Sequence, residues 1–325
     1  VPGGDGESIT FTVQDQGRSQ KLAYRGITPD LFVESSGVVA DRRLGPARVF
    51  VAGPVLTPTT PDEARTQVAG VAAQQVDIAK IRVDDNLGAS PKMTPDVYRA
   101  VITEAHARGL RLAVHMYYFA DAVDLLNSGA DFIAHSVRDV PVTDAFATSL
   151  RDKNVCYSPT LMREVSTFVY ESTPSFFSDS LFLAHANTAW MATLQQPARM
   201  KAMRTNAAAQ QYKKQLPVAM RNLKALSDAG VRIAMGTDTG PMGRFQGYFE
   251  LMELEMMVEA GMTPRAVLAA ATRDAAACMR IDRELGTLEP GKWADFVVLN
   301  ANPLESIANV RKQHSVWIAG QQVGR

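Results

Sequence analysis

The chain has 325 residues, and its 34 Lys and Arg residues balance 34 Asp and Glu residues, so the formal net charge is zero. This balance gives no electrostatic footprint for nucleic acid or for an anionic membrane surface, and neither is expected as a partner. Apolar residues make up 46% of the sequence, which is enough for a sizeable globular core. No stretch reaches the roughly 18 uninterrupted apolar residues that cross a membrane.

The first 46 residues are the least regular part of the sequence, and we expect a poorly defined N-terminal segment at 1–46. Val1–Gly6 lacks the composition of a signal peptide, so a cytoplasmic protein and an exported one whose targeting segment is not included both remain open. Residues 8–13 alternate between polar and apolar side chains, as a half-buried β-strand does. Residues 30–45 show no clear period.

From residue 47 onward, predicted strands alternate with predicted helices. Thr60-Pro61 and Thr94-Pro95 are typical helix starts, because Thr caps the first turn and Pro needs no hydrogen bond there. In chain order we predict strands at 48–53, 77–83, 110–115, 131–135, 155–158 and 231–235, and helices at 61–75, 94–108, 119–128, 216–229, 248–260 and 264–278. This alternation predicts a parallel α/β sheet, and the length fits a TIM-like (β/α)8 barrel of roughly 250 residues.

The predicted barrel occupies residues 47–284 and contains a long helical insertion at 161–215. An insertion after a barrel strand is well placed to form a lid or a substrate wall, and the alternative is an additional outer helix layer. Residues 285–325 change to short strands with turns and predict a small β-sandwich element. Cys156 and Cys278 lie far apart and form no C-x-x-C pair, so we predict two small buried residues rather than a disulfide or metal ligands.

Four predicted strands end in residues that bind metals: Lys80, His115, His135 and Asp238. They are 35, 20 and 103 residues apart, which leaves room for at least one helical crossover each. The carboxyl ends of parallel barrel strands meet at one face, where such enzymes keep their chemistry. The sequence therefore predicts a metal centre.

Each of these residues also has a structural interpretation. A histidine at a strand end is often a hydrogen-bonded core residue, a lysine can extend its amine to solvent, and an aspartate can cap a helix. Two histidines at neighbouring strand ends favour the metal centre. His106 and His314 have no such pattern and are expected at the surface, while His185 stays open.

Candidate substrate-binding residues follow the same strand ends. We assign this role to residues in the expected top-face loops: Tyr117, Tyr118, Ser136, Arg138, Arg163 and Arg244. An arginine can hold a substrate carboxylate through two parallel hydrogen bonds. For each arginine the alternative is an ordinary ion pair.

The end of the chain carries a family resemblance. Residues 285–299, LGTLEPGKWADFVVL, followed by 302–304 and 316–320, closely resemble the C-terminal signature of the amidohydrolase superfamily. Residues 236–240, 258–264 and 269–272 resemble its imidazolonepropionase-like and prolidase-like branch. The resemblance covers about residues 47–325, and five pieces in the same order make it specific.

The resemblance implies a role for each strand-end residue. Lys80 matches a lysine that is carboxylated in many members and bridges two divalent metals, and His115 and His135 match two further ligands. Asp238 matches an aspartate that binds one metal and accepts the proton of the attacking water. A bound divalent ion lowers the pKa of its water towards about 7, and imidazole with carbamate oxygen suits zinc.

The sequence departs from the family at one point. Members carry a His-x-His at the end of their first barrel strand, but the first histidine here is His106. Three explanations stay open: the N-terminal portion lies outside this chain, residues have been lost from within it, or the protein is a truncated or remodelled relative. The barrel would then be incomplete at its N-terminus, and the four remaining ligands suffice for one tetrahedral ion but not for two.

We therefore predict a metal-dependent hydrolase of amide C–N bonds in small peptides or cyclic amides, with a divalent metal, most readily zinc, as one or two ions. The same chemistry serves lactones, esters and organophosphates, which form the first alternative. The second is a catalytically inactive barrel that acts as a binding protein. A small molecule or short peptide is the expected partner, and a homo-oligomer stays open.

Overall fold

A four-stranded parallel sheet forms the centre of the molecule. The computed structural model describes residues 8–15, 18–25 and 49–324. The sheet order is β3(Ala79–Arg82), β4(Leu112–His115), β5(Phe132–Ala134), β6(Cys156–Ser158), and all three neighbouring pairs are parallel. Each crossover between these strands contains a helix, as parallel pairing requires.

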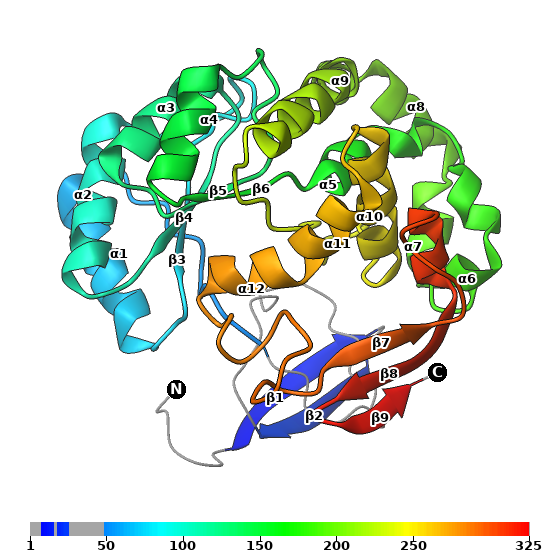
Figure 1. Cartoon of the computed structure of the whole chain (residues 1–325). Coiled ribbons are helices and arrows are strands. Elements are labelled where there is room, and N and C mark those ends of the chain that lie inside the picture. Colours follow the sequence, from blue (N-terminus) through cyan, green and yellow to red (C-terminus); the bar gives the residue numbers. More distant parts are fainter. Residues whose placement is uncertain (1–7, 16–17, 26–48, 325) are drawn as a thin grey trace.

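Single parallel bridges extend the sheet on both sides. Leu56 pairs with Ile81 of β3, and Ile233 pairs with Tyr157 of β6. The described residues thus provide six consecutive parallel positions. In Figure 1 the helices α1 to α4 lie beside strands β3 to β6. The predicted strand at 48–53 is wrong, because its described part forms no ladder, and that at 231–235 is reduced to the bridge at Ile233.

The helices and the remaining strands follow in chain order. They are β1(Ser8–Asp15), β2(Arg18–Arg25), α1(Pro61–Ala73), α2(Pro95–Ala107), α3(Phe119–Ser128), α4(Asp144–Asp152), α5(Leu161–Ser166), η1(Val169–Glu171), η2(Ser175–Ser178), α6(Ser180–Leu183), α7(Thr188–Leu194), α8(Pro197–Thr205), α9(Ala207–Asp228), α10(Tyr248–Glu259), α11(Pro264–Ala271), α12(Arg273–Met279), β7(Phe296–Leu299), η3(Ile307–Arg311), β8(Gln313–Ile318) and β9(Gln321–Gly324).

Both Thr-Pro pairs lie at helix starts as predicted, but Thr94 makes no side-chain capping hydrogen bond. Thr60 accepts a hydrogen bond from the Glu63 amide, and Pro61 occupies the first turn of α1. Two boundaries differ. Helix α9 runs from Ala207 through Pro217 without the predicted break at 215–216, and the predicted helix 264–278 is interrupted at Thr272.

The main core lies between the sheet and the helices around it. Ile81, Val114, Ile133 and Tyr157 of the sheet are fully buried. Consecutive positions of β4 are all buried, which explains why this strand is a continuous apolar run rather than an alternating one.

A second core fills the inside of the predicted insertion. It consists of aromatic and large apolar side chains from the insertion, from the loop before α10 and from the first turn of α10: Met162, Tyr170, Phe176, Phe177, Phe182, Leu194, Phe245, Tyr248 and Phe249. Many of these rings meet edge to face, as between Phe182 and Phe245 at 4.8 Å. The insertion is therefore a packed unit fixed to α10.

Two antiparallel sheets are separate from the parallel one. Strands β7, β8 and β9 form a three-stranded sheet at the end of the chain, where a small β element was expected. The strand predicted at 8–13 exists as β1, which pairs with β2 from Ser8↔Arg25 to Asp15↔Arg18.

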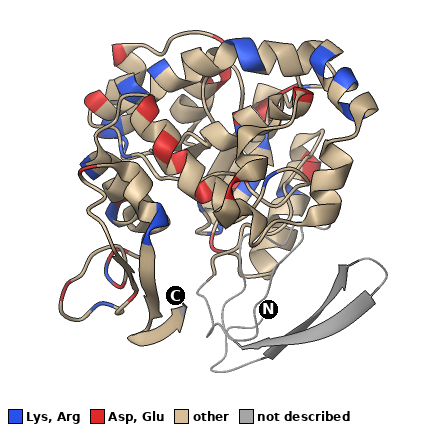
Figure 2. Ribbon diagram, turned by 90° about the vertical axis from the view of Figure 1, so that its right-hand side faces the viewer, with Lys and Arg blue, Asp and Glu red and all other residues tan. Residues whose placement is uncertain are grey.

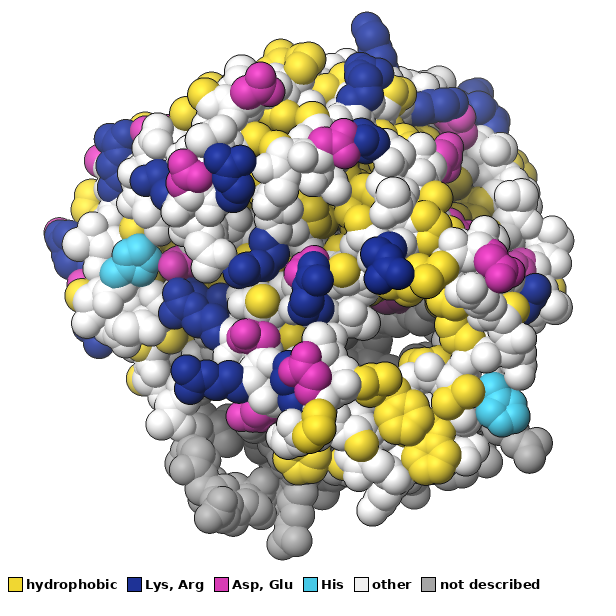
Figure 3. Space-filling model, in the orientation of Figure 1, with side chains coloured by type: hydrophobic (Ala, Val, Ile, Leu, Met, Phe, Trp, Pro, Cys, Tyr) yellow, Lys and Arg dark blue, Asp and Glu magenta, His cyan; other side chains and the backbone are white. Residues whose placement is uncertain are grey.

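Charges of both signs are interspersed over the helices (Figure 2) and, with apolar side chains between them, over the face seen in Figure 3. This distribution agrees with the zero net charge. Within the described ranges, no helix has both the length and the apolar character needed to span a bilayer.

The prediction for the two cysteines is wrong. Cys156 of β6 and Cys278 of α12 form a disulfide across 122 residues of sequence. Both are buried, at 4% and 2% exposure, beside Ala234. The spacing rule failed because it looks for close pairs, whereas the fold brings a barrel strand and the last helix together.

We expect the double variant Cys156→Ser/Cys278→Ser to unfold more readily, because a bridge over a long loop restricts the unfolded chain. Its stabilisation is typically about 2–4 kcal/mol, or roughly 5–15 °C in melting temperature. Calorimetry of the wild type and of the double variant measures the difference in melting temperature, and counting reactive thiols under native conditions shows whether the bridge is formed. Two reactive thiols in the native wild type, with unchanged melting, would contradict the bridge.

Candidate functional site

Two histidines lie side by side at the carboxyl end of the parallel sheet. His115 is the last residue of β4, and His135 follows the last residue of β5. The ladder pairs His115 with Ala134, and His135, the next residue, has a left-handed backbone that interrupts the alternation of the strand. Their ring centroids are 4.3 Å apart in an edge-on arrangement.

An aspartate orients His115. Its Nε2 lies 2.7 Å from Oδ2 of Asp84, whose side chain is fully buried. Burial lowers the pKa of His115 to about 4, and the Asp84 carboxylate offsets this only in part. Burial also raises the pKa of Asp84, but His115 and Arg82 outweigh it and hold that pKa well below its usual range. A neutral His115 that donates from Nε2 leaves the Nδ1 lone pair available.

A threonine contacts His135. Nδ1 of His135 lies 2.8 Å from Oγ1 of Thr160, and both side chains are buried. Burial, followed by the charge of His115, lowers the pKa of His135 well below its ordinary value. Both residues have left-handed backbones, with φ of 73° at His135 and 46° at Thr160. Such conformations are uncommon outside glycine and concentrate at functional sites.

Lys80 and Asp238 take different positions around this pair. Lys80 lies half-buried on β3 and contributes through its charge to the lowered pKa of His135. Asp238 also has a left-handed backbone, with φ of 55°. Its Oδ2 accepts a hydrogen bond from Nη1 of Arg244 at 2.5 Å, and its side chain is 32% exposed. The structure thus brings His115 and His135 into contact, while Asp238 is paired with Arg244.

The donor atoms fit one divalent ion better than two. Metal ligands must be deprotonated, and the lowered pKa values keep both imidazoles neutral at pH 7. Among the residues that the structure describes, His, Cys, Asp and Glu side chains form no group of three or more that could hold a metal. Within the described residues, the histidine pair therefore offers two nitrogen donors.

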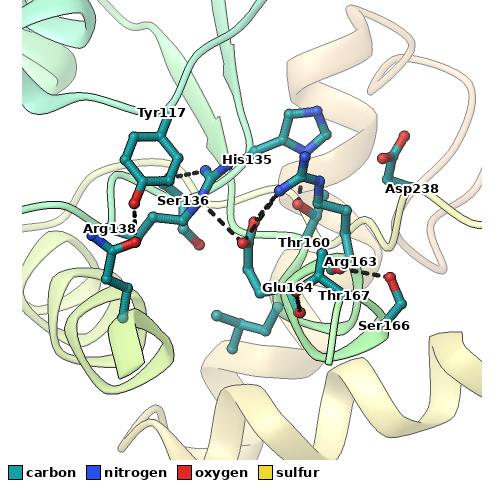
Figure 4. Close-up of polar contacts among 12 residues, drawn as sticks. Tyr117, His135, Ser136, Arg138, Thr160, Arg163, Glu164, Ser166, Thr167 and Asp238 are labelled. Carbon is teal, nitrogen blue, oxygen red and sulfur yellow. Dashed lines mark hydrogen bonds and ion pairs between the residues drawn. The ribbon is translucent and has the colours of Figure 1, made fainter. Parts of the chain in front are cut away.

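A buried charge cluster borders the histidines. Glu164 lies between Arg138 and Arg163 (Figure 4), with Nε of Arg138 3.0 Å from Oε2 and Nη1 of Arg163 3.1 Å from Oε1. All three side chains are nearly inaccessible. The Arg138 guanidinium also lies 4.5 Å from the Tyr117 ring centroid. Two guanidinium groups thus share one carboxylate.

The other predicted substrate-binding residues line the same region. Ser136 is fully buried and donates to the carbonyl of Pro159 at 2.7 Å. The Tyr117 hydroxyl donates to Gln215, and the Tyr118 hydroxyl donates to Asp85 at 2.9 Å. His106, His185 and His314 are exposed, as expected for the first and last.

Sequence reasoning missed several residues of this site. Asp84, Thr160 and Glu164 each contact a predicted site residue. A signal existed for Asp84, because Asp84 and Asp85 directly follow the predicted strand 77–83. Thr160 and Glu164 lie at the start of the insertion, and nothing in their spacing points to the histidines or the arginines.

The chain is similar to one protein family over most of its length and to two kinds of curated protein over shorter segments. Residues 23–323 match the sequence profile of the amidohydrolase family. Over 77 residues the chain is 39% identical to the imidazolonepropionase of Geobacillus kaustophilus, covering 24% of this chain and 18% of that protein. Over 52 residues it is 52% identical to the cytochrome c-type biogenesis protein CcmE of Rhodospirillum centenum, covering 16% of this chain and 31% of that protein. The chain thus spans under a third of each of these relatives.

Solved structures match over most of the chain. A Xaa-Pro dipeptidase with bound methionine superposes with a TM-score of 0.67 at 21% identity and covers 87% of this chain and 70% of the dipeptidase. A putative prolidase from Bifidobacterium longum gives a TM-score of 0.66 at 27% identity and covers 87% and 67%. These similarities confirm the predicted barrel fold class.

The metal-free protein is expected to lose stability as the pH falls from about 7 towards 4. The pKa of His115 in the folded protein is about 4, below its ordinary value of 6.5. As the pH falls between these values, the imidazole takes up a proton in the unfolded chain before it does so in the folded protein. The stability that His115 contributes is therefore fully present above pH 6.5 and is lost as the pH falls towards 4. The loss is about 3 kcal/mol. Denaturation midpoints across this range measure it. The variant His115→Asn should flatten the curve, whereas His106→Gln, at an exposed site, should not; equal curves for all three would contradict the assignment.

Proposed function

The chain belongs to the amidohydrolase family, and on this basis we propose that it is a metal-dependent hydrolase of amide C–N bonds in small peptides or cyclic amides. The observation that carries the proposal is the buried pair His115 and His135, neutral and 4.3 Å apart at the carboxyl end of the sheet. In α/β barrels this end holds the catalytic residues.

Four residues would hold the metal: Lys80, His115, His135 and Asp238. When bound, a divalent ion such as zinc supplies polarisation of the scissile carbonyl and a more acidic water. Asp238 accepts the proton of the attacking water and delivers it to the leaving nitrogen, as a general base and then a general acid. Arg244 holds the Asp238 carboxylate in place through Nη1, which contacts both Oδ2 and the backbone carbonyl.

Substrate recognition involves the charge cluster and the insertion. Arg138 and Arg163 outnumber Glu164, which favours a substrate that carries a carboxylate. A pocket of about 340 Å³ opens beside Tyr212, between α8 and α9, and the Tyr212 ring centroid is 5.3 Å from the Arg163 guanidinium. This size suits a small apolar group. The names of the prolidase and dipeptidase neighbours agree with a short peptide.

Two alternatives remain distinct proposals. A lactone, ester or organophosphate hydrolase would use the same residues. A barrel that only binds its ligand is favoured by one observation: in the described part of the chain, no three His, Cys, Asp or Glu side chains form a group that could hold a metal ion.

Metal analysis separates the enzyme from the inert barrel. We expect purified protein loaded with Zn²⁺ to retain about one ion per chain, because the described donors suffice for one site. Elemental analysis after gel filtration measures the ratio, and His115→Ala should lower it. Retention of no ion would support the inert barrel, and two ions would require ligands beyond these four.

We expect Asp238→Asn to lower kcat for a dipeptide or cyclic-amide substrate by roughly 10²-fold or more, since general base catalysis contributes about 10²–10⁴-fold. The fold should stay intact, as judged by circular dichroism. Asp228→Asn, which alters an exposed ion pair with Lys224, serves as the matched control. Full hydrolysis by the Asp238 variant would remove this residue as the base, and a panel with lactones and phosphotriesters identifies the scissile bond.

A further inference from the structure

Helix α10 contacts the loops that carry the site at two points. Glu250 and Glu253 are three residues apart and so lie on the same side of the helix. Glu250 binds the loop that holds Asp238, and Glu253 binds the start of α5. Glu250 also caps α10 itself through the amide of Gly247, whereas the two hydrogen bonds of Glu253 go to the start of α5.

Glu250 holds the residues on both sides of Asp238. Its Oε1 accepts from Oγ1 of Thr237 at 2.6 Å and from Oγ1 of Thr239 at 2.7 Å. Both threonines are buried, at 5% and 7% exposure. Its Oε2 accepts from the Gly247 amide at 2.6 Å. The left-handed backbone of Asp238, with φ of 55°, is thereby fixed from its two neighbours.

Glu253 replaces the side chain that would ordinarily cap α5. A threonine before a helix normally accepts a hydrogen bond from an amide of the first turn. Thr160 makes no such bond, and its hydroxyl contacts Nδ1 of His135 instead. Glu253 accepts from the amides of Leu161 at 2.8 Å and Met162 at 2.7 Å, and it is fully buried.

We propose that Glu250 and Glu253 are positioning residues, which fix Asp238 and the Thr160–His135 contact respectively; this inference rests on the proposed hydrolase function. With the first-turn amides satisfied by Glu253, the Thr160 hydroxyl accepts the Nδ1 proton of His135. The lone pair of His135 then lies on Nε2. Asp84 leaves the lone pair of His115 on Nδ1, so the two rings present opposite nitrogens.

The proposal fits the packing of α10. Tyr248 and Phe249, at its first turn, belong to the aromatic core of the insertion. Two residues after Glu253, Glu255 forms a two-point ion pair with Arg311, at 2.6 and 2.8 Å. The helix is thus held rigidly by contacts outside the site, which is the condition for it to orient loops within the site.

The helix supplies its own matched control. Glu255→Gln removes an ion pair on the same helix but leaves the contacts of Glu250 and Glu253 in place. We expect this variant to lower the melting temperature without changing Zn²⁺ affinity or kcat by more than about 2-fold, since outer ion pairs contribute mainly to stability.

The test for Glu253 compares Glu253→Gln with Glu255→Gln. The glutamine side chain has one acceptor oxygen, so it satisfies only one of the two first-turn amides of α5. The Thr160 hydroxyl then turns to cap the other amide, and His135 loses its hydrogen-bond partner. We expect Zn²⁺ affinity by calorimetry to fall about 10- to 100-fold, as it does when outer contacts of metal ligands are removed. Thr160→Val should reproduce the loss and Thr160→Ser should not.

A second readout is independent of metal and turnover. In the metal-free wild type, ¹⁵N NMR of His135 should show a proton on Nδ1, whereas Glu253→Gln should show a mixture of tautomers. If Glu253→Gln keeps the tautomer and Zn²⁺ affinity of the wild type and only melts earlier, the positioning role is overturned. A wild type that binds no Zn²⁺ and hydrolyses no amide defeats the proposed function, but the tautomer still decides the role of Glu253.

Glu250 is tested through the catalytic step. Glu250→Gln should lower kcat for the dipeptide about 10- to 100-fold with little change in KM, and should shift the acidic limb of the pH–rate profile. If Glu250→Gln raises only KM, or if its kcat equals that of Glu255→Gln, Glu250 does not position Asp238.

Discussion

The pairing of β4 with β5 is the constraint on which the site depends. The ladder sets His115 opposite Ala134, and His135, the next residue, leaves the strand with a left-handed backbone, φ of 73°, and its ring lies 4.3 Å from that of His115. With an extended backbone, His135 would point to the other face of the sheet from His115, since side chains alternate along a strand. The register in turn is fixed by the buried neighbours Val114 and Ile133, which occupy the core on the other side. Packing of the core and placement of the histidines are therefore one requirement.

Burial then decides the charge state of this region. Two imidazoles within 4.3 Å of each other at low exposure cannot both be protonated without a large cost. They remain neutral, and neutral imidazole is the form that binds metals. The buried charges beside the histidines, by contrast, are stabilised by ion pairs. Arg138 and Arg163 keep theirs because Glu164 lies between them, and the cluster retains one positive charge. Neutral imidazoles and a positive cluster thus lie side by side in this region.

The sequence predicted those parts of the fold and site that depend on local pattern. Buried runs that end in Lys80, His115 and His135 identified three neighbouring strands, and the Thr-Pro pairs located two helix starts. It could not predict contacts made across long distances in the chain. Cys156 and Cys278 are joined only because β6 and α12 meet in space. Asp84 had a local signal, but Glu253 lies 118 residues beyond His135 and looks like any acidic residue on a helix.

Three left-handed residues at this end of the sheet explain why so many outer contacts are present. His135, Thr160 and Asp238 all have positive φ. For residues with a side chain such backbones cost about 1–2 kcal/mol each, so they persist only where the surroundings hold them. The Thr160 hydroxyl holds the side chain of His135, Glu253 holds the amides after Thr160, and Glu250 holds the threonines on both sides of Asp238. Each strained residue thus has a partner on a neighbouring segment, and two of these partners belong to one helix. The cost of the strain and the rigidity of α10 are consequently linked, because loosening the helix would let all three backbones relax away from the geometry that the site requires.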